Sequence, residues 1–175
     1  MSVSRYRVPC GYLAGALVFL LARPTPLSLM GGSLLAVLGE AVRLWASGHI
    51  RKTRVLATGG PYALSRNPLY LGSLLLALGV AVASASLWVV LAVAVYFLAF
   101  YPPVMREEAA FLAEKFPEYA DWAREVPLFL PRLTPGGPRG SRFDWAQVRA
   151  NREWRTALAL PVLVILLYAR GRLLP

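Results

Sequence analysis

The longest stretch without a charged residue limits what this chain can fold into. Residues 67–105 contain 39 consecutive uncharged residues. A membrane-spanning helix needs roughly 20 apolar residues, so this stretch is long enough for two such helices. Its midpoint, Ala83-Ser84-Ala85-Ser86, is small and weakly polar, as expected for a tight turn. The stretch therefore predicts a helical hairpin in a membrane.

The chain as a whole has the composition of a membrane protein. Hydrophobic residues make up 57% of its 175 residues, and the mean hydropathy is +0.52. This is too apolar for an ordinary soluble domain, and we expect an all-α integral membrane protein with about five membrane helices. The helices are predicted at residues 8–22, 27–47, 68–83, 87–104 and 155–169. The first could instead be a signal peptide, although no clean small-residue cleavage site follows it.

The net charge of +10 is distributed in a way that argues against nucleic-acid binding. Residues 102–154 hold eight basic and eight acidic residues, so the largest polar segment is neutral. The excess lies in short segments, at Arg5, Arg7, Arg51, Lys52, Arg54 and Arg66. Such a pattern places basic loops on the cytoplasmic side of a membrane. We therefore expect the N-terminus, the 48–67 loop and residues 102–154 to lie in the cytoplasm.

A polar, turn-forming segment precedes the first helix of the hairpin. Asn67-Pro68 is a helix-start signal, because Asn is a favoured N-cap and Pro is well tolerated at the first helical position. Gly72 has no side chain and would allow close approach of a ligand or helix. Arg66 adds a positive charge beside the helix end. The segment predicts an anion-accepting pocket formed with the backbone N–H groups of Leu69, Tyr70 and Leu71.

A pair of glutamates follows the hairpin on the same side of the membrane. Glu107 and Glu108 are adjacent, so on a helix their side chains point about 100° apart and only one readily faces a given pocket. A carboxylate there could accept hydrogen bonds from a ribose diol or neutralise a cation. We therefore expect a cytoplasmic pocket formed by the helical hairpin and the following amphipathic segment.

Three further titratable residues are candidates of lower weight. Glu40 and Arg43 lie one turn apart inside an apolar stretch, where charges are costly unless they are paired or face a cavity. A mutually neutralising pair is the simpler interpretation. His49 is the only histidine, and a lone loop histidine is more often a surface residue than a participant in chemistry.

Two segments, taken together, resemble a known family. They are "TGGPYALSRNPLYLGSLLLALG" and "REEAAFLAEKFPEYADWAREVPLFLP". Their order and spacing resemble those of the isoprenylcysteine carboxyl methyltransferase and phospholipid methyltransferase superfamily, over roughly residues 38–131. Those proteins are small integral membrane enzymes that use S-adenosylmethionine. Their pattern is an Arg-His-Pro-x-Tyr-x-Gly stretch at a helix start, then a Glu-Glu pair, then Phe-Gly-x-x-Tyr and Val-Pro elements.

The resemblance implies both the cofactor and the residues that would bind it. Arg66 and Glu108 are the implied catalytic residues, and no metal site is implied. The implied cofactor-binding residues are Pro61, Tyr62, Arg66, Asn67, Pro68, Tyr70, Leu71, Gly72, Glu107 and Glu108. The cofactor carboxylate would lie at the helix end behind Pro68, and the ribose would lie near a glutamate.

The chain departs from the family pattern at several positions. Asn67 stands where the family often has His, so it can cap the helix but cannot act as an acid or base. Pro117 replaces the Gly of the Phe-Gly element, and Trp122 stands where a second Tyr is common. We divide the chain into a methyltransferase core, 1–138, and a C-terminal extension, 139–175. The extension reads as an interfacial helix followed by a hydrophobic one, and it could close the pocket, anchor the domain or mediate a homodimer.

The resemblance implies a methyltransferase that uses S-adenosylmethionine and acts on an amphipathic or lipid acceptor from the bilayer. A carboxylate acceptor needs no base and could be oriented by Arg66. An amine acceptor would need a base, for which Glu107, Glu108 and Glu40 are the candidates; a thiol acceptor also stays open. Two other functions stay open, namely a membrane reductase with a nicotinamide cofactor and a non-enzymatic membrane scaffold.

Overall fold

The computed structural model describes residues 15–16, 18–51, 54–137, 140 and 142–173, and its regular elements there are all helical. The elements are α2 (Pro26–His49), the 3-10 helix η1 (Gly60–Ala63), α3 (Pro68–Ser84), α4 (Leu87–Lys115), α5 (Tyr119–Glu125), α6 (Trp145–Ala150) and α7 (Trp154–Leu173). This confirms the all-α prediction.

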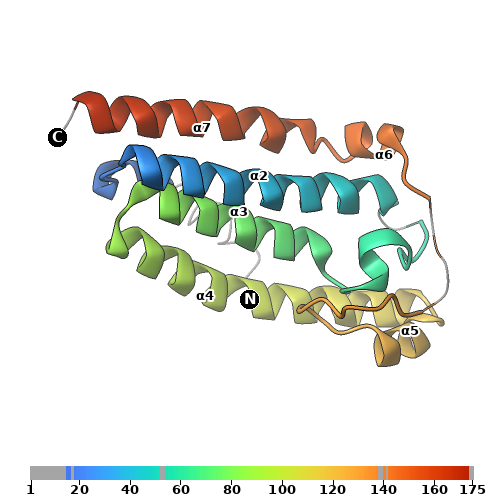
Figure 1. Cartoon of the computed structure of the whole chain (residues 1–175). Helices are drawn as coiled ribbons and strands as arrows, with labels where there is room; N and C mark the ends of the chain where they lie inside the picture. Colours follow the sequence, from blue (N-terminus) through green and yellow to red (C-terminus); the bar gives the residue numbers. More distant parts are fainter. Residues whose placement is uncertain (1–14, 17, 52–53, 138–139, 141, 174–175) are drawn as a thin grey trace.

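Four long helices lie side by side, in the spatial order α7, α2, α3 and α4 (Figure 1). The short elements η1, α5 and α6 gather at one end of this row of helices, which we call the loop end. Residues from the α2–α3 connection, from the C-terminal part of α4 and from the start of α7 therefore meet at the loop end. This end holds the polar segments that the sequence singled out.

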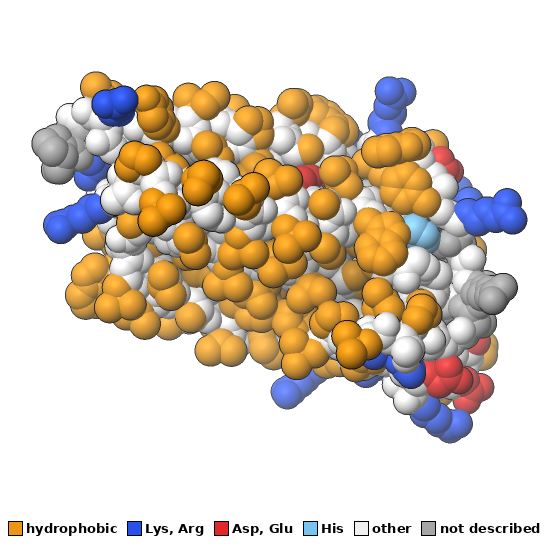
Figure 2. Space-filling view, viewed as in Figure 1, with side chains coloured by type: hydrophobic (Ala, Val, Ile, Leu, Met, Phe, Trp, Pro, Cys, Tyr) orange, Lys and Arg blue, Asp and Glu red, His pale blue; other side chains and the backbone are white. Residues whose placement is uncertain are grey.

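Three helices, α2, α4 and α7, are long and apolar enough to cross a membrane. The fourth, α3, is also apolar but has only 17 residues. Most of the predicted helix at 8–22 lies outside the described residues, although residues 15, 16 and 18–21 are helical. Hydrophobic side chains cover the flank of the molecule, and charged side chains gather mainly towards its two ends (Figure 2). The chain is a membrane protein by these criteria.

Small residues bring α2 and α3 into backbone contact. A Cβ added to Gly39 would lie 2.5 Å from the backbone nitrogen of Leu76, and one added to Gly79 would lie 2.5 Å from that of Ala36. A Cβ on Gly32 would meet the backbone nitrogen of Ala83 at 2.4 Å. Small residues at such spacing let membrane helices approach closely and pack by van der Waals contact.

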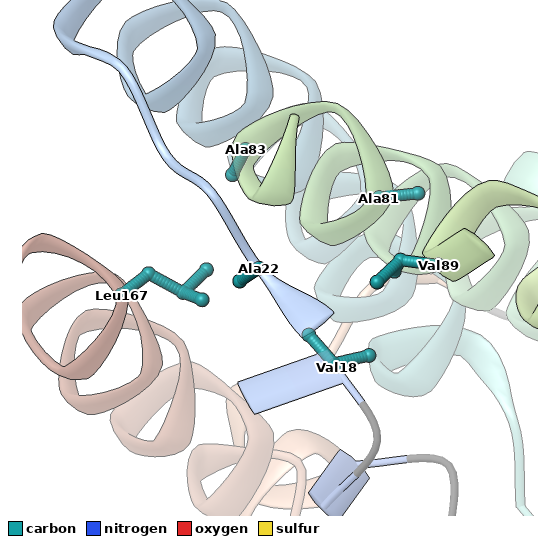
Figure 3. Close-up of a cluster of buried hydrophobic side chains, with 6 residues drawn as sticks. All are labelled: Val18, Ala22, Ala81, Ala83, Val89 and Leu167. Carbon is teal, nitrogen blue, oxygen red and sulfur yellow. The ribbon is translucent and has the colours of Figure 1, made fainter. Parts of the chain in front are cut away.

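A hydrophobic cluster joins the helices at the end opposite the loop end. It consists of Val18, Ala22, Ala81, Ala83, Val89 and Leu167. Figure 3 shows Ala22 between Leu167 of α7 on one side and the α3 and α4 side chains on the other. The backbone N–H of Arg23 also donates to the carbonyl of Ser84 at 2.7 Å. The helices are thus held together at this end by residues outside the candidate site.

The predicted hairpin turn is confirmed, because α3 ends at Ser84, α4 begins at Leu87, and Ala85 adopts a left-handed conformation with φ 48°. The predicted end of the second hairpin helix at residue 104 is wrong. Helix α4 continues through Pro102 and Pro103 to Lys115. Each proline removes a single backbone donor, and neighbouring contacts can offset such a loss in a membrane helix. The continuation carries the glutamate pair on α4 itself.

Candidate functional site

A cavity of about 760 Å³ opens at the loop end. Its walls come from four parts of the chain, namely the end of α2 with the following loop, η1 with the start of α3, the C-terminal half of α4 with α5, and the start of α7. Its polar and charged lining residues are Arg43, Arg51, Tyr62, Arg66, Asn67, Tyr70, Ser73, Tyr101, Glu108, Trp122, Asn151, Arg152, Glu153, Arg155 and Thr156.

The segment before α3 is fixed by the chain that follows α5. The backbone N–H of Arg66 donates to the carbonyl of Pro127 at 2.9 Å. The hydroxyl of Ser65 donates to the carbonyl of Phe129 at 2.7 Å, and the side-chain amide of Asn67 donates to the carbonyl of Leu128 at 2.9 Å. The Val-Pro element of the sequence therefore serves as a backbone support for the residues around Arg66.

The side chain of Asn67 does not cap α3, so that part of the sequence interpretation is wrong. Its amide donates to the carbonyl of Leu128, and the Asn67 side chain makes no capping hydrogen bond at the start of the helix. The backbone N–H groups of Tyr70 and Leu71 also donate to the carbonyl of Asn67, both at 3.1 Å. Two of the three amides that we expected to receive an anion are therefore already bonded within the helix.

Arg66 lies against an aromatic side chain of α5. Its Nη1 donates to the hydroxyl of Tyr119 at 2.9 Å, and its Cζ lies 5.9 Å from the centre of that ring. The Nε atom is buried and has no hydrogen-bond partner among the described residues. Arg66 therefore retains a buried donor on a side chain that lines the cavity.

Two further lining side chains carry buried polar atoms without partners in the described part of the chain, the hydroxyl of Tyr62 and the indole N–H of Trp122. Burial raises the pKa of Tyr62 above its usual range, and the charge of Glu108 raises it further. The hydroxyl of Tyr62 therefore stays protonated at neutral pH. Since buried polar groups are nearly always hydrogen-bonded, three such atoms around one cavity call for an explanation.

Glu108 lines the cavity and Glu107 does not, as expected for adjacent positions on a helix. The hydroxyl of Tyr70 donates to Oε2 of Glu108 at 3.0 Å. This bond joins the first turn of α3 to α4 and leaves the carboxylate half-buried at the cavity wall. The side chain of Glu107 is exposed.

The implied cofactor-binding residues divide into two groups by position. Tyr62, Arg66, Asn67, Pro68, Tyr70 and Glu108 line the cavity, whereas Pro61, Leu71, Gly72 and Glu107 do not. Gly72 lies at the contact between helices, because an added Cβ would meet Cγ of Arg43 at 2.6 Å and the carbonyl of Gly39 at 2.7 Å. Its lack of a side chain therefore serves α2–α3 packing. A cofactor-binding role for any of these residues stays a prediction.

The main partner of Arg43 is a residue that the sequence did not single out. Nε and Nη2 of Arg43 both lie 2.6 Å from Oε1 of Glu153, whereas Glu40 is 3.8 Å away. Arg43 also donates through Nη1 to the hydroxyl of Ser73. Both carboxylate oxygens of Glu40 are buried without a hydrogen-bond partner in the described residues. Glu153 is the single acidic residue within 145–175, and it lies just before the last apolar helix. This isolated acidic residue was the signal in the sequence that could have identified it as a partner for Arg43.

His49 is buried, contrary to the expectation of a surface histidine. It is the last residue of α2, its Nδ1 lies 2.9 Å from the carbonyl oxygen of Trp45, and a Cβ added to Gly60 would meet its ring at 2.4 Å. Gly60 itself has φ +59°. No group of three or more His, Cys, Asp or Glu side chains with metal-site geometry occurs within the part of the chain that the structure describes.

Comparisons with known proteins identify the family. Residues 26–119 match the model of the phospholipid methyltransferase family. The chain is 45% identical over 112 residues to the cobalt-zinc-cadmium resistance protein CzcN of Cupriavidus metallidurans, covering 63% of this chain and 52% of that protein. It is 37% identical over 105 residues to the nickel-cobalt-cadmium resistance protein NccN of Alcaligenes xylosoxydans xylosoxydans, covering 59% of this chain and 49% of that protein.

The match therefore spans about half the length of these curated relatives. No solved structure matches the chain significantly. The family match covers more than half of the chain and includes α2, α3, α4 and the glutamate pair. This chain belongs to the phospholipid methyltransferase family, within the isoprenylcysteine carboxyl methyltransferase-like superfamily.

Proposed function

We propose that this membrane protein transfers a methyl group from S-adenosylmethionine to an amphipathic or lipid acceptor. The observation that carries the proposal is the cavity at the loop end, whose lining residues Tyr62, Arg66 and Trp122 carry buried polar atoms without hydrogen-bond partners among the described residues. Unmet hydrogen bonds are costly in a buried site, so three such groups on the lining residues of one cavity favour a bound polar ligand.

The residues around the cavity fit the chemistry of this cofactor. The volume of about 760 Å³ is in the usual range for small-molecule and cofactor sites. Arg66 can pair with the methionyl carboxylate, and Glu108 can accept hydrogen bonds from ribose hydroxyls or offset positive charge. Tyr62 and Trp122 supply neutral donors. Asn67 has none of these roles. Its amide donates to the carbonyl of Leu128 and so helps to hold the segment that carries Arg66.

Methyl transfer requires the protein mainly to position the methyl donor and the acceptor. When bound, S-adenosylmethionine supplies an activated methyl group and a neutral leaving group. The protein has to hold donor and acceptor in line and exclude water, and such positioning can supply on the order of 7–11 kcal/mol. A carboxylate acceptor needs no base. For an amine acceptor, Glu108 is the best placed of the three predicted bases, because Glu107 and Glu40 do not line the cavity.

Apolar lining residues support an acceptor that enters from the bilayer. Leu69 of α3 and Phe111 and Leu112 of α4 share the cavity wall with the polar groups. Phe111 is 48% exposed, on a helix that is long and apolar enough to cross a membrane.

We further propose that the loop end faces the cytoplasm, because it carries Arg51, Arg54 and Arg66. A homodimer through the extension stays a prediction.

The decisive experiment is binding of S-adenosylhomocysteine to the purified protein, measured by calorimetry. Arg66→Ala and Glu108→Gln should each weaken binding by about tenfold or more, the usual effect of losing a charged hydrogen bond in a buried site. Glu107→Gln is the matched control, because it makes the same chemical change one residue away, outside the cavity lining. It should leave the affinity unchanged.

The same titration tests the two alternatives. Saturable binding of a nicotinamide dinucleotide, with none of S-adenosylhomocysteine, would replace the methyltransferase proposal with a reductase. No cofactor binding in a folded sample, together with wild-type behaviour of the Arg66 and Glu108 variants, would favour a scaffold.

The names of the two relatives suggest a physiological setting. We propose that methyl transfer by this chain contributes to metal resistance, as those names imply for the proteins that carry them. Cells that express the wild-type chain should then tolerate more cobalt or cadmium than cells that express Glu108→Gln at equal protein levels. Equal tolerance would separate this chain from that setting without bearing on cofactor binding.

A further inference from the structure

The start of α7 and the turn before it form one wall of the cavity, although they lie outside the region that matches the family. Asn151, Arg152, Glu153, Arg155 and Thr156 all line it. We propose that Arg152 and Arg155, together with Arg51, bind the anionic group of the methyl acceptor, which is therefore an anionic amphiphile. This inference rests on the proposed function and names the substrate class of the same cavity.

The wall is anchored on both sides of Arg152. The side-chain amide of Asn151 donates to the carbonyls of Ser47 at 3.0 Å and Ile50 at 3.1 Å. On the other side, Glu153 is buried and ion-paired with Arg43. Both anchors lead to α2 or to the residue after it. Arg152 is thus presented at the cavity by a turn that is tied to the core at each neighbouring residue.

The backbone of Arg152 is held in an unfavourable conformation. Its φ is +58°, in the left-handed region that residues other than glycine rarely adopt. Such strain persists only where the surroundings impose it, and it often marks a functional position. The neighbouring anchors impose it here, and the chain has an arginine at a position where a glycine would be unstrained.

The charge balance of the cavity favours an anion. Five arginines and two glutamates line it, and the pair of Arg43 with Glu153 removes one of each. Arg51, Arg66, Arg152 and Arg155 have no ion-pair partner in the described part of the chain, which leaves four positive charges against Glu108. S-adenosylmethionine carries a net positive charge, so it would increase this excess. Arg66 suffices for its carboxylate, and the other three arginines are then available to an anionic acceptor.

The test measures lipid binding by native mass spectrometry of the detergent-purified protein loaded with S-adenosylhomocysteine. The probes are phosphatidylglycerol and phosphatidylcholine with identical chains, with hexadecanoate and inorganic phosphate as further arms. Wild-type protein should prefer phosphatidylglycerol over phosphatidylcholine by about tenfold, which is the effect expected from one or two charged contacts. Binding of hexadecanoate would extend the site to carboxylates. If inorganic phosphate binds and neither anionic amphiphile does, the arginines form a site for free phosphate and the inference is overturned.

Three variants make the test specific. Arg152→Gly removes the side chain while suiting the positive φ, and Arg155→Gln removes the second charge; each should abolish most of the preference. Arg149→Gln is the control, because this exposed arginine lies on α6 in the same basic segment but outside the cavity lining. It should keep the wild-type preference.

Three further results would overturn the inference. They are equal binding of both lipids by wild-type protein, a preference that persists in both Arg152→Gly and Arg155→Gln, and equal loss of the preference in Arg149→Gln. Affinity for S-adenosylhomocysteine should stay within about twofold in all three variants, because that ligand uses other residues. If wild-type protein binds no S-adenosylhomocysteine but keeps the lipid preference, the cofactor proposal fails and the anionic site stands.

Discussion

Oε1 of Glu153 lies 2.6 Å from both Nε and Nη2 of Arg43, a residue 110 positions earlier in the chain. The bond joins the start of α7 to the pair of helices α2 and α3, because Arg43 also donates to Ser73 on α3. The side chain of Arg43 is only 20% exposed and that of Glu153 only 7%. Residues 151–156 of the C-terminal extension are therefore part of the candidate site.

Glu153→Gln should destabilise the protein. Breaking a buried ion pair leaves the remaining charge uncompensated and typically costs about 3–5 kcal/mol, of which Glu40, 3.8 Å from Arg43, would recover a part. Thermal unfolding in detergent measures the loss. Glu114→Gln, at an exposed position of α4, should leave the unfolding temperature unchanged. Equal unfolding temperatures for the Glu153→Gln and wild-type proteins would mean that the ion pair contributes nothing to stability.

Tyr62→Phe should have opposite effects on stability and on binding. The hydroxyl of Tyr62 is buried and has no hydrogen-bond partner among the described residues, so its removal should stabilise the ligand-free protein by about 1–2 kcal/mol. The same change should weaken S-adenosylhomocysteine binding by about tenfold, if the hydroxyl donates to that ligand. Thermal unfolding and calorimetry on one preparation give both values. A variant that is less stable and binds normally would assign Tyr62 a purely structural role.

The raised pKa of Tyr62 predicts how stability depends on alkaline pH. Above the ordinary tyrosine value of 10.0, the unfolded chain releases the phenolic proton while the folded protein retains it. Stability then falls as pH rises, by up to about 1.4 kcal/mol per pH unit from this group. Wild-type protein should therefore lose stability above pH 10 more steeply than Tyr62→Phe does. Parallel curves from unfolding measured between pH 9 and pH 11 would contradict the prediction.

Two glycines on α2 should respond to alanine in opposite ways. A Cβ on Gly39 would lie 2.5 Å from the backbone of Leu76, so Gly39→Ala should force α2 and α3 apart and cost about 1–3 kcal/mol. A Cβ added to Gly31 would have no neighbour within 4 Å in the described part of the chain, and Gly31→Ala should stabilise the helix by about 1 kcal/mol. Thermal unfolding of both variants checks the signs. A destabilised Gly31→Ala or a neutral Gly39→Ala would contradict the close packing.

The hydrophobic pattern predicted the helices well and their side-chain contacts poorly. The uncharged stretch and the Ala-Ser turn located α3 and the start of α4, because both signals are local. Helical spacing predicted that only one of Glu107 and Glu108 would face the pocket, and the structure shows that Glu108 does. The capping role of Asn67 was predicted wrongly, because Leu128, a residue distant in sequence, competes for its amide.

The contribution of the extension could not be read from local patterns. Pairing of Arg43 with Glu153 depends on how α7 packs against α2, and spacing along the sequence carries no information on that packing. The pairing of Glu40 with Arg43 was predicted from helical spacing and is present only as the longer contact, at 3.8 Å. Local patterns likewise do not predict that the donors of Tyr62 and Trp122 lack partners among the described residues, because this depends on the side chains packed around them.

The backbone contact between α2 and α3 has a consequence for how this protein can change during evolution. Gly32, Gly39 and Gly79 each lie against main-chain atoms, so replacing any of them with a larger residue would move a helix. The wall that holds Arg152 is attached to the same helices through side chains, which single substitutions can replace. Divergence in what the cavity accepts should therefore accumulate in the C-terminal extension, while the glycine-packed pair of helices stays nearly invariant.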